Sequence, residues 1–171
     1  MNQATAPSAW VKRFVGTVLD LACGRGRHSR LLAGMGCSVE AVDRDGEALG
    51  TLADLDHVTT RCADLEGGPW PYGGRDFAGS VVTNYLWRPL LPLLLAALAP
   101  DGVLIYETFM LGHERFGKPS NPAFLLRPGE LLDVVRTRLT VVAFEQGELA
   151  AAQPAVVQRL CAIRGGISRL P

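Results

Sequence analysis

The sequence predicts an α/β fold in which helices wind over both faces of a mostly parallel sheet. Short β-branched runs alternate with helix-like runs along most of the chain, which is typical of repeated β-α-β units. A glycine-rich turn lies directly between the first expected strand and the first expected helix. The last two β-branched runs follow one another without a helix, which predicts an antiparallel hairpin at one edge of a seven-stranded sheet. With 171 residues, the chain is expected to form a single domain over residues 1–171.

Each element is expected from its apolar pattern and its end signals. The expected strands are Thr17–Ala22, Val39–Asp43, His57–Cys62, Phe77–Thr83, Gly102–Thr108, Thr140–Phe144 and Ala155–Ile163. The expected helices are Arg27–Met35 with Gly36 as its stop, Gly46–Leu55, Pro89–Leu98, and one from Pro128 to about Thr137. Two stretches resist assignment: Leu65–Arg75, which is rich in glycine and proline, and Met110–Arg127, whose apolar and aromatic residues predict an ordered loop.

Composition narrows the class of partner. The 17 basic and 17 acidic residues give a formal net charge of zero, whereas proteins that bind a nucleic-acid backbone usually carry a basic surplus. The apolar run Leu90–Ala99 is too short to span a bilayer and contains Pro92. The N-terminal residues lack the apolar core of a secretory signal. A cytoplasmic protein without a membrane or nucleic-acid partner is expected.

The cysteines predict neither disulfides nor a metal site. Cys23, Cys37, Cys62 and Cys161 are widely spaced and form no zinc-binding pattern. A chain of this length can be stable without disulfides, so free thiols in a reducing compartment are expected.

The main candidate for a ligand site is the turn Asp20-Leu-Ala-Cys-Gly24-Arg-Gly26-Arg-His28. Glycines at a strand-to-helix turn let the backbone bend sharply and approach a ligand closely. The helix that follows presents free N–H groups and the positive end of its dipole. Many nucleotide-binding folds share such a turn, and a tight turn without a ligand is the alternative.

Acidic residues at later strand ends favour a nucleoside ligand. Asp43 ends the second expected strand, 17 residues after Gly26, where a carboxylate can accept hydrogen bonds from both ribose hydroxyls. Asp64 follows the third strand and could accept from an adenine amino group, while the Leu65 N–H could donate to a ring nitrogen. Together with Asp20, these acids would stand at three successive strand ends.

These motifs resemble those of the class I S-adenosylmethionine-dependent methyltransferases. VLDLACGRG resembles that family's first motif, AVDRD its acidic second motif and CADLE its adenine-binding third, and the similarity continues through TNYLWRPLLPLLLAALAPDGVLIYETF. It covers roughly Trp10 to Arg164 and is closest to small bacterial methyltransferases grouped with tellurite-resistance enzymes, with ERFGKPSNPAFLLRPGEL resembling a loop of that subgroup. The resemblance implies a Rossmann-like fold, S-adenosylmethionine as cofactor and methyl transfer as activity.

The resemblance also implies a set of cofactor-binding residues. These are Asp20, Ala22, Cys23, Gly24, Gly26, His28, Asp43, Arg44, Asp64, Leu65, Thr83 and Asn84. Asp20 and the turn would hold the methionyl part, and Thr83, Asn84 and Tyr85 would line the floor beneath the sulfonium. There are two departures from the family pattern. Ala22 replaces a frequent glycine, at an expected low cost, and the usual helix between the third and fourth strands is nearly missing.

Methyl transfer from a sulfonium mainly needs alignment of the acceptor and exclusion of water. A general base is needed only if the acceptor must lose a proton. Candidates near the reaction centre follow the fourth and fifth strands: Asn84, Tyr85, Arg88, Tyr106, Glu107 and Thr108. Tyr106 could equally be a core residue, and Glu107 could pair with an arginine for structure.

Two regions of the chain keep two interpretations each. The loop Met110–Arg127 is expected to be either a wall of the acceptor site or a plain connector. Within it, His113 and Glu114 are either substrate contacts or solvated loop residues. At the N-terminus, Trp10, Arg13 and Phe14 form either a lid over the cofactor or a packed helix.

Two other functions remain open at this point. A NAD-dependent oxidoreductase also uses a glycine turn and an acidic second strand, but its turn reads Gly-x-Gly-x-x-Gly, whereas here Ser29 stands at the third glycine's position. The second open function is that of a non-catalytic module that binds the cofactor or a partner protein. No Asn-Pro-Pro-Tyr-type motif follows the fourth strand, which argues against methylation of nucleic-acid bases and favours a small-molecule acceptor.

Overall fold

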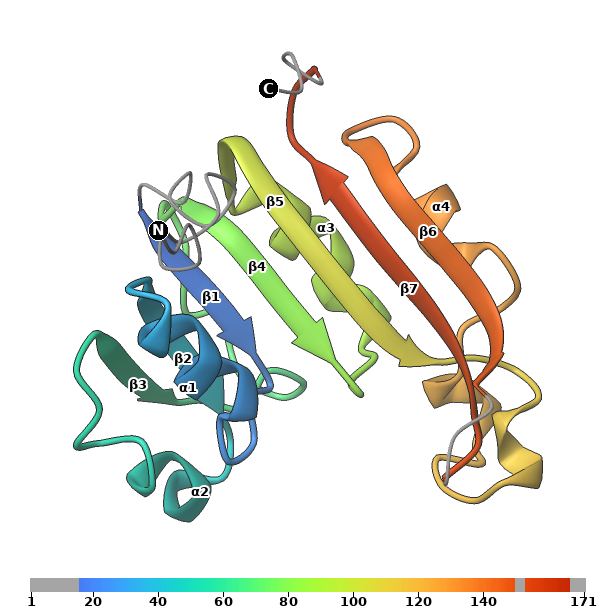
Figure 1. Cartoon of the computed structure of the whole chain (residues 1–171), viewed down its shortest axis with the longest axis horizontal. Helices are drawn as coiled ribbons and strands as arrows, with labels where there is room; N and C mark the ends of the chain where they lie inside the picture. The colour runs from blue at the N-terminus through green and yellow to red at the C-terminus, as the bar shows by residue number, and fades with distance from the viewer. Residues whose placement is uncertain (1–15, 150–152, 167–171) are drawn as a thin grey trace, which may run out of the picture.

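The strands form one mixed sheet. The computed structural model describes residues 16–149 and 153–166 (Figure 1). Trp10, Arg13 and Phe14, for which a lid and a packed helix were both open, lie outside the described residues. The strands are β1 Thr17–Leu21, β2 Ser38–Asp43, β3 Val58–Cys62, β4 Phe77–Thr83, β5 Leu98–Phe109, β6 Thr140–Leu149 and β7 Ala155–Ile163. Their order is β3-β2-β1-β4-β5-β7-β6. The first five are parallel, and β7 runs antiparallel to both β5 and β6. The predicted seven-stranded sheet with its antiparallel edge hairpin is confirmed.

The helices are shorter than the sequence predicts. They are α1 Arg27–Gly34, α2 Gly46–Gly50, α3 Leu91–Ala96 and α4 Glu130–Val135, with 3-10 turns η2 Arg88–Leu90, η3 His113–Arg115 and η4 Pro122–Phe124. Leu98 was expected to end a helix but begins β5, because it pairs with Phe77 of β4. The strand β6 was expected to end at Phe144 but continues to Leu149, since backbone pairing with β7 does not depend on the polarity of its side chains.

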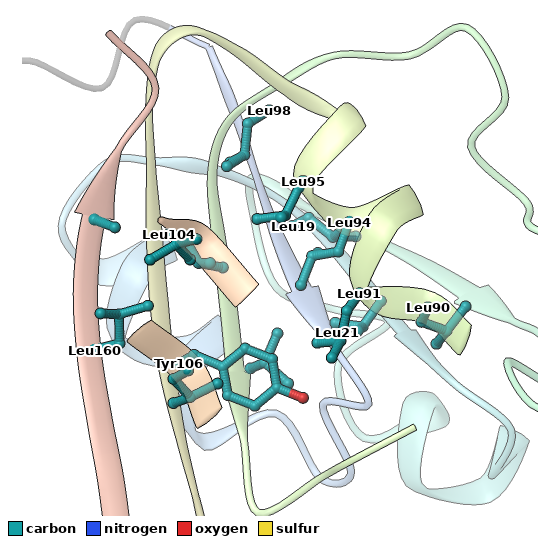
Figure 2. Packing of buried hydrophobic residues seen from close by; sticks show 14 of the residues in the cluster. Leu19, Leu21, Leu90, Leu91, Leu94, Leu95, Leu98, Leu104, Tyr106 and Leu160 are labelled. Atoms are coloured by element: carbon teal, nitrogen blue, oxygen red, sulfur yellow. The ribbon is translucent and has the colours of Figure 1, made fainter. Parts of the chain in front are cut away.

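Helices cover both faces of the sheet. Figure 1 shows α1 and α2 in front of β1, β2 and β3, and α3 and α4 behind the strands that follow. The larger core lies between the sheet and α3 with α4. Figure 2 shows Leu91, Leu94 and Leu95 of α3 packed toward Leu19 and Leu104 of the sheet. Burial of each of these leucine side chains contributes about 1.5–3 kcal/mol to the stability of the fold. This packed layer therefore holds the strands, and with them the strand ends where a ligand site is expected, in fixed positions.

Aromatic packing takes the place of a helix between β3 and β4. Tyr72 is buried and makes edge-to-face contacts with Trp70 and Phe77, at centroid distances of 5.3 and 5.2 Å. Arg61 and Arg75 lie over the Tyr72 ring. Both arginines also pair, at 3.2 Å, with the buried carboxylate of Glu40 in β2. The Gly/Pro-rich stretch Leu65–Arg75 is therefore packed against the sheet without a helix of its own, as the sequence predicts.

The loop Met110–Arg127 is ordered, as expected. The Leu111 N–H donates to the Leu126 carbonyl at 2.9 Å, which closes the base of the loop. His113 is buried rather than solvated: its ring stacks on Phe109 at 4.1 Å, and its Nδ1 accepts from the Val156 N–H at 3.4 Å. Glu114 accepts from the Gly112 N–H at 2.7 Å and thereby shapes the first turn of the loop.

Neither a membrane-spanning helix nor a metal-binding cluster is found in the described ranges. Within residues 16–149 and 153–166, no helix combines the length and the apolar character needed to cross a membrane. In the same part of the chain, no group of three or more His, Cys, Asp or Glu side chains is arranged to hold a metal ion.

Candidate cofactor site

The glycine-rich turn bends sharply where β1 ends. Ala22, Gly24 and Gly26 all have positive φ, at 53°, 55° and 71°. A Cβ on Gly26 would come within 2.4 Å of Leu52 Cδ1, so only glycine lets the turn pack this closely on the segment after α2. Ala22 has room for its methyl group, but its left-handed backbone costs an L-residue about 1–2 kcal/mol. The sequence-based expectation that alanine costs little here took account of the small size of its side chain. It did not include the left-handed backbone conformation, which the sequence does not reveal.

Asp43 ties the end of β2 to this turn. Its Oδ2 accepts from the Gly24 N–H at 2.8 Å, and its Oδ1 accepts from the Asp45 N–H at 3.0 Å. A carboxylate has about four acceptor positions, so each oxygen keeps capacity for a further donor. The carboxylate is therefore held in place by the protein while it remains able to bind a ligand.

Asp64 begins a tight turn after β3. Its Oδ1 accepts from the Glu66 and Gly67 N–H groups at 3.0 and 3.1 Å, and these bonds hold the pKa of Asp64 below its usual value. A Cβ on Gly67 would lie 2.7 Å from Asp64 Oδ2, and one on Gly68 would lie 2.6 Å from the Asp64 carbonyl oxygen. The glycine pair is what allows the chain to fold back under this carboxylate.

These strand ends enclose a small cavity of about 170 Å³, lined by Ala22, Asp43, Arg44, Ala63, Asp64, Leu65, Glu66 and Tyr85. Ala22, Ala63, Leu65 and Tyr85 belong to or pack against the larger core and give the cavity its apolar part, whereas the other lining residues are charged. Sites that enclose a whole drug-sized ligand usually measure about 300–1,000 Å³, so this cavity suits one end of a larger ligand.

Most of the lining was predicted from the sequence. The turn, Asp43 with Arg44, and Asp64 with Leu65 come together as their places at strand ends imply. Ala63 and Glu66 were missed, although both flank the Asp64-Leu65 pair in the chain. Their adjacency to a predicted adenine site was the signal that could have identified them.

Several predicted cofactor residues lie outside the lining of this cavity. Asp20 sits within β1 and not at its end; it is buried, and its Oδ2 accepts from the Ser29 hydroxyl at 2.5 Å. Burial raises the pKa of Asp20 despite that hydrogen bond. His28 Nδ1 lies 3.3 Å from Thr83 Oγ1, which joins α1 to the end of β4. Cys23 remains in the turn, where its N–H donates to the Val42 carbonyl at 3.0 Å.

Four of the six candidates near the reaction centre divide into two pairs. Asn84, with φ 54°, is exposed just after β4, and its N–H donates to the Glu107 carbonyl at 2.9 Å. Tyr85 lines the cavity. Tyr106 is a core residue whose hydroxyl donates to the Tyr85 carbonyl at 2.9 Å. Glu107 pairs with Arg159 at 2.6 Å, which matches the structural alternative proposed for it.

Arg88 connects the segment after β4 to the loop Met110–Arg127. Its guanidinium donates to both carboxylate oxygens of Glu130, at 2.7 and 3.0 Å, and to the carbonyls of Ala123 and Leu125 at 2.6 and 2.9 Å. Burial opposes ionisation of Glu130, but the hydrogen bonds from Arg88 and the Arg127 N–H outweigh it and hold the pKa of Glu130 below its usual value. Arg88 is therefore a clamp, with four of its five N–H donors engaged.

Known proteins are similar to this chain in sequence motif and in fold. A sequence model of the family "Tellurite resistance protein TehB" matches residues 9–66. No curated protein matches the sequence significantly.

Solved structures match over most of the chain. TehB from Haemophilus influenzae has a TM-score of 0.70 at 18% identity, over 88% of this chain and 58% of that one, so the present chain spans little more than half of that protein. The N-methyltransferase NodS from Bradyrhizobium japonicum WM9 has a TM-score of 0.70 at 16% identity, covering 91% and 89%. The Burkholderia thailandensis 1,6-didemethyltoxoflavin-N1-methyltransferase, solved with 1,6-didemethyltoxoflavin and S-adenosylhomocysteine, has a TM-score of 0.67 at 18% identity, covering 92% and 74%.

The fold of this chain agrees with those of the matched structures over 88–92% of its length. The resemblance seen in the motifs is thus confirmed at the level of the fold. This chain has the fold of the class I S-adenosylmethionine-dependent methyltransferases.

Proposed function

We propose that this protein is an S-adenosylmethionine-dependent methyltransferase that acts on a small-molecule acceptor. The observation that carries the proposal is the cavity beside the glycine turn, in which Asp43 and Asp64 flank an apolar floor. Asp43 would accept hydrogen bonds from the ribose hydroxyls, and Asp64 from the adenine amino group. The Leu65 N–H would donate to a ring nitrogen of the adenine.

The residues of the cavity fit the nucleoside end of that cofactor. The apolar floor suits the faces of a purine ring, and both carboxylates keep acceptor capacity after their bonds to backbone N–H groups. When bound, the cofactor supplies an electrophilic methyl group on its sulfonium. The turn from Ala22 to Gly26, with His28 and Thr83 beside it, would hold the methionyl end, and buried Asp20 would support this turn from within β1.

The acceptor would lie over the ends of β4 and β5. Asn84, which is exposed just after β4, would orient it, and the loop Met110–Arg127 would form a wall that excludes water. The Arg88 clamp supports this role, because it fixes the loop to the segment three residues after Tyr85. Tyr106 and Glu107 would act indirectly, through the backbone of Tyr85 and the pairing of β5 with β7.

The oxidoreductase alternative is disfavoured by Ser29. A third glycine in a NAD-binding turn serves close packing of helix and strand. Here Ser29 is fully buried, and its hydroxyl donates to Asp20 of β1, so the position has a different role. We further place the protein in a reducing compartment, the cytoplasm, since all four of its cysteines are free.

Titration calorimetry is expected to show binding of S-adenosylmethionine and of S-adenosylhomocysteine, and no binding of NAD of similar strength. The reason is the combination of acids at the ends of β2 and β3 with the glycine turn of β1. Incubation of the protein with labelled S-adenosylmethionine and a panel of small acceptors then tests for methyl transfer. Tight NAD binding without a response to either sulfur-containing ligand would refute the proposed function.

Replacement of Asp43 by alanine is expected to weaken S-adenosylhomocysteine binding at least about tenfold. A hydrogen bond to a charged group is worth about 1.5–3 kcal/mol, and about 1.4 kcal/mol corresponds to a factor of ten. Asp43→Asn retains one acceptor oxygen and should lose less. The control is Asp45→Asn, which keeps the cap of α2 and should bind normally. Unchanged affinity in Asp43→Ala would show that Asp43 does not bind the ribose.

A further inference from the structure

One residue that lines the cavity carries a buried polar atom without a partner within the protein. In the described part of the chain, three buried side-chain hydroxyls make no hydrogen bond: those of Tyr72, Ser80 and Tyr85. Of these residues, Tyr85 alone lines the cavity at the ends of β1, β2 and β3. A buried donor without a partner costs free energy, so a ligand that accepts from it would recover that cost on binding.

The backbone of Tyr85 is fixed from the side of β5. The preceding residue, Asn84, has a left-handed φ of 54°, and its N–H donates to the Glu107 carbonyl at 2.9 Å. The Tyr85 carbonyl accepts from the buried hydroxyl of Tyr106, also at 2.9 Å. These bonds turn the chain at the end of β4, and the Tyr85 ring packs against the larger core with Ala22 and Ala63, which line the same cavity.

The Tyr85 hydroxyl can act as a donor but is unsuited to be a base. Burial raises the pKa of this phenol, and the nearby carboxylates of Glu66 and Asp64 raise it further. The hydroxyl therefore stays protonated at neutral pH. Tyr85 lines the same cavity as Asp43, Asp64 and Leu65, the residues proposed to bind the nucleoside.

We propose that the Tyr85 hydroxyl donates a hydrogen bond to the nucleoside end of the bound cofactor, to a ring nitrogen or a sugar oxygen. This inference rests on the proposed function. It makes Tyr85 a residue that determines cofactor affinity, with Tyr106 as the residue that positions it. The recognition of the nucleoside then includes a donor from the segment after β4, beside the acceptors at the ends of β2 and β3.

The test is Tyr85→Phe, which keeps the ring and removes the hydroxyl. Calorimetry should show S-adenosylhomocysteine binding about tenfold more weakly than in the wild type, as expected for one hydrogen bond. The variant's melting temperature without ligand should be equal or higher, since an unpartnered buried hydroxyl has been removed. Ser80→Ala is the matched control, because it removes another unpartnered buried hydroxyl from β4 and should leave the affinity unchanged.

A second ligand locates the contact. 5′-Methylthioadenosine lacks the amino-acid part, and its affinity should fall by the same factor in Tyr85→Phe. Tyr106→Phe, which leaves the Tyr85 phenol intact, should give a smaller loss for both ligands. Wild-type affinity for S-adenosylhomocysteine in Tyr85→Phe would overturn the inference and leave the proposed function standing. A loss confined to S-adenosylhomocysteine would overturn the nucleoside contact, and failure of the wild type to bind either ligand would overturn both proposals.

Discussion

Replacing Arg88 with alanine is expected to lower the free energy of unfolding by about 2–3 kcal/mol. The change leaves the Glu130 carboxylate buried without its main partner, and it removes the donors to the Ala123 and Leu125 carbonyls. The estimate lies below the about 3–5 kcal/mol typical of a fully buried pair, because the Arg88 side chain is 37% exposed. Urea denaturation at neutral pH measures it.

The same variant should change the pH dependence of stability. In the wild type the pKa of Glu130 is depressed, so its contribution is present above the unfolded pKa of about 4.3 and is lost as the pH falls through the lower, folded pKa. Without Arg88, only the contacts with Arg127 oppose the tendency of burial to raise the pKa of Glu130. The pKa of Glu130 should therefore be less depressed than in the wild type, or even raised. The wild type should therefore lose more stability between about pH 5 and 3 than Arg88→Ala does. An equal loss in both proteins would contradict the clamp.

Arg88→Ala also tests the role of the loop Met110–Arg127. If the loop forms the acceptor wall, methyl transfer should fall about tenfold or more, while S-adenosylhomocysteine affinity changes little. Glu130→Gln, and the double variant with Arg88→Ala, complete a cycle that isolates the pair. Full turnover with a released loop would show that the loop is only a connector.

Gly26→Ala is expected to destabilise the protein by about 2–4 kcal/mol and to weaken S-adenosylhomocysteine binding more than tenfold. A left-handed φ costs alanine about 1–2 kcal/mol, and overpacking of a core costs about 1–3 kcal/mol. The neighbour that the new methyl group meets is Leu52, which is fully buried and has little space to move into. The turn and the start of α1 would have to shift, and with them the N–H groups that we propose face the cofactor.

Gly36→Ala is the control for this change. Gly36 also has a positive φ, at 85°, but an added Cβ would meet nothing within 4 Å. It follows α1 and lies away from the cavity, so its replacement should cost only the backbone term and leave binding unchanged. If both variants lose the same stability, the contact between Gly26 and Leu52 is not what requires glycine in the turn.

The sequence was sufficient to predict a mostly parallel seven-stranded sheet and the positions of Asp43 and Asp64 at the ends of its strands. Both acids end or follow a parallel strand, and the carboxyl ends of such strands meet at one edge of the sheet. The edge hairpin was predictable because the two β-branched runs have no helix between them. The hydrophobic periodicity of the strands and the residues of the turns are local signals. The parallel sheet, its edge hairpin and the acids at the strand ends all follow from such local signals.

Features that depend on distant partners could not be predicted. Arg88 and Glu130 are 42 residues apart, and no local pattern shows which arginine meets which carboxylate. The burial of His113 depends on the packing of Phe109 and Val156, which the linear sequence does not reveal. The strain at Ala22 is also invisible in the sequence, because the same residue is unstrained in most other backbone conformations.

The position of β7 has a consequence for biosynthesis. Within residues 16–149 and 153–166 it is the last strand, yet it lies between β5 and β6, and β6 pairs there with no other strand. While the ribosome is still translating the codons before Ala155, the chain can assemble the parallel strands, but β6 must wait without a pairing partner. The sheet is therefore completed only when residues 155–163 have left the exit tunnel, and a nascent chain stalled before that point exposes one open edge at β5 and a solitary strand beyond it.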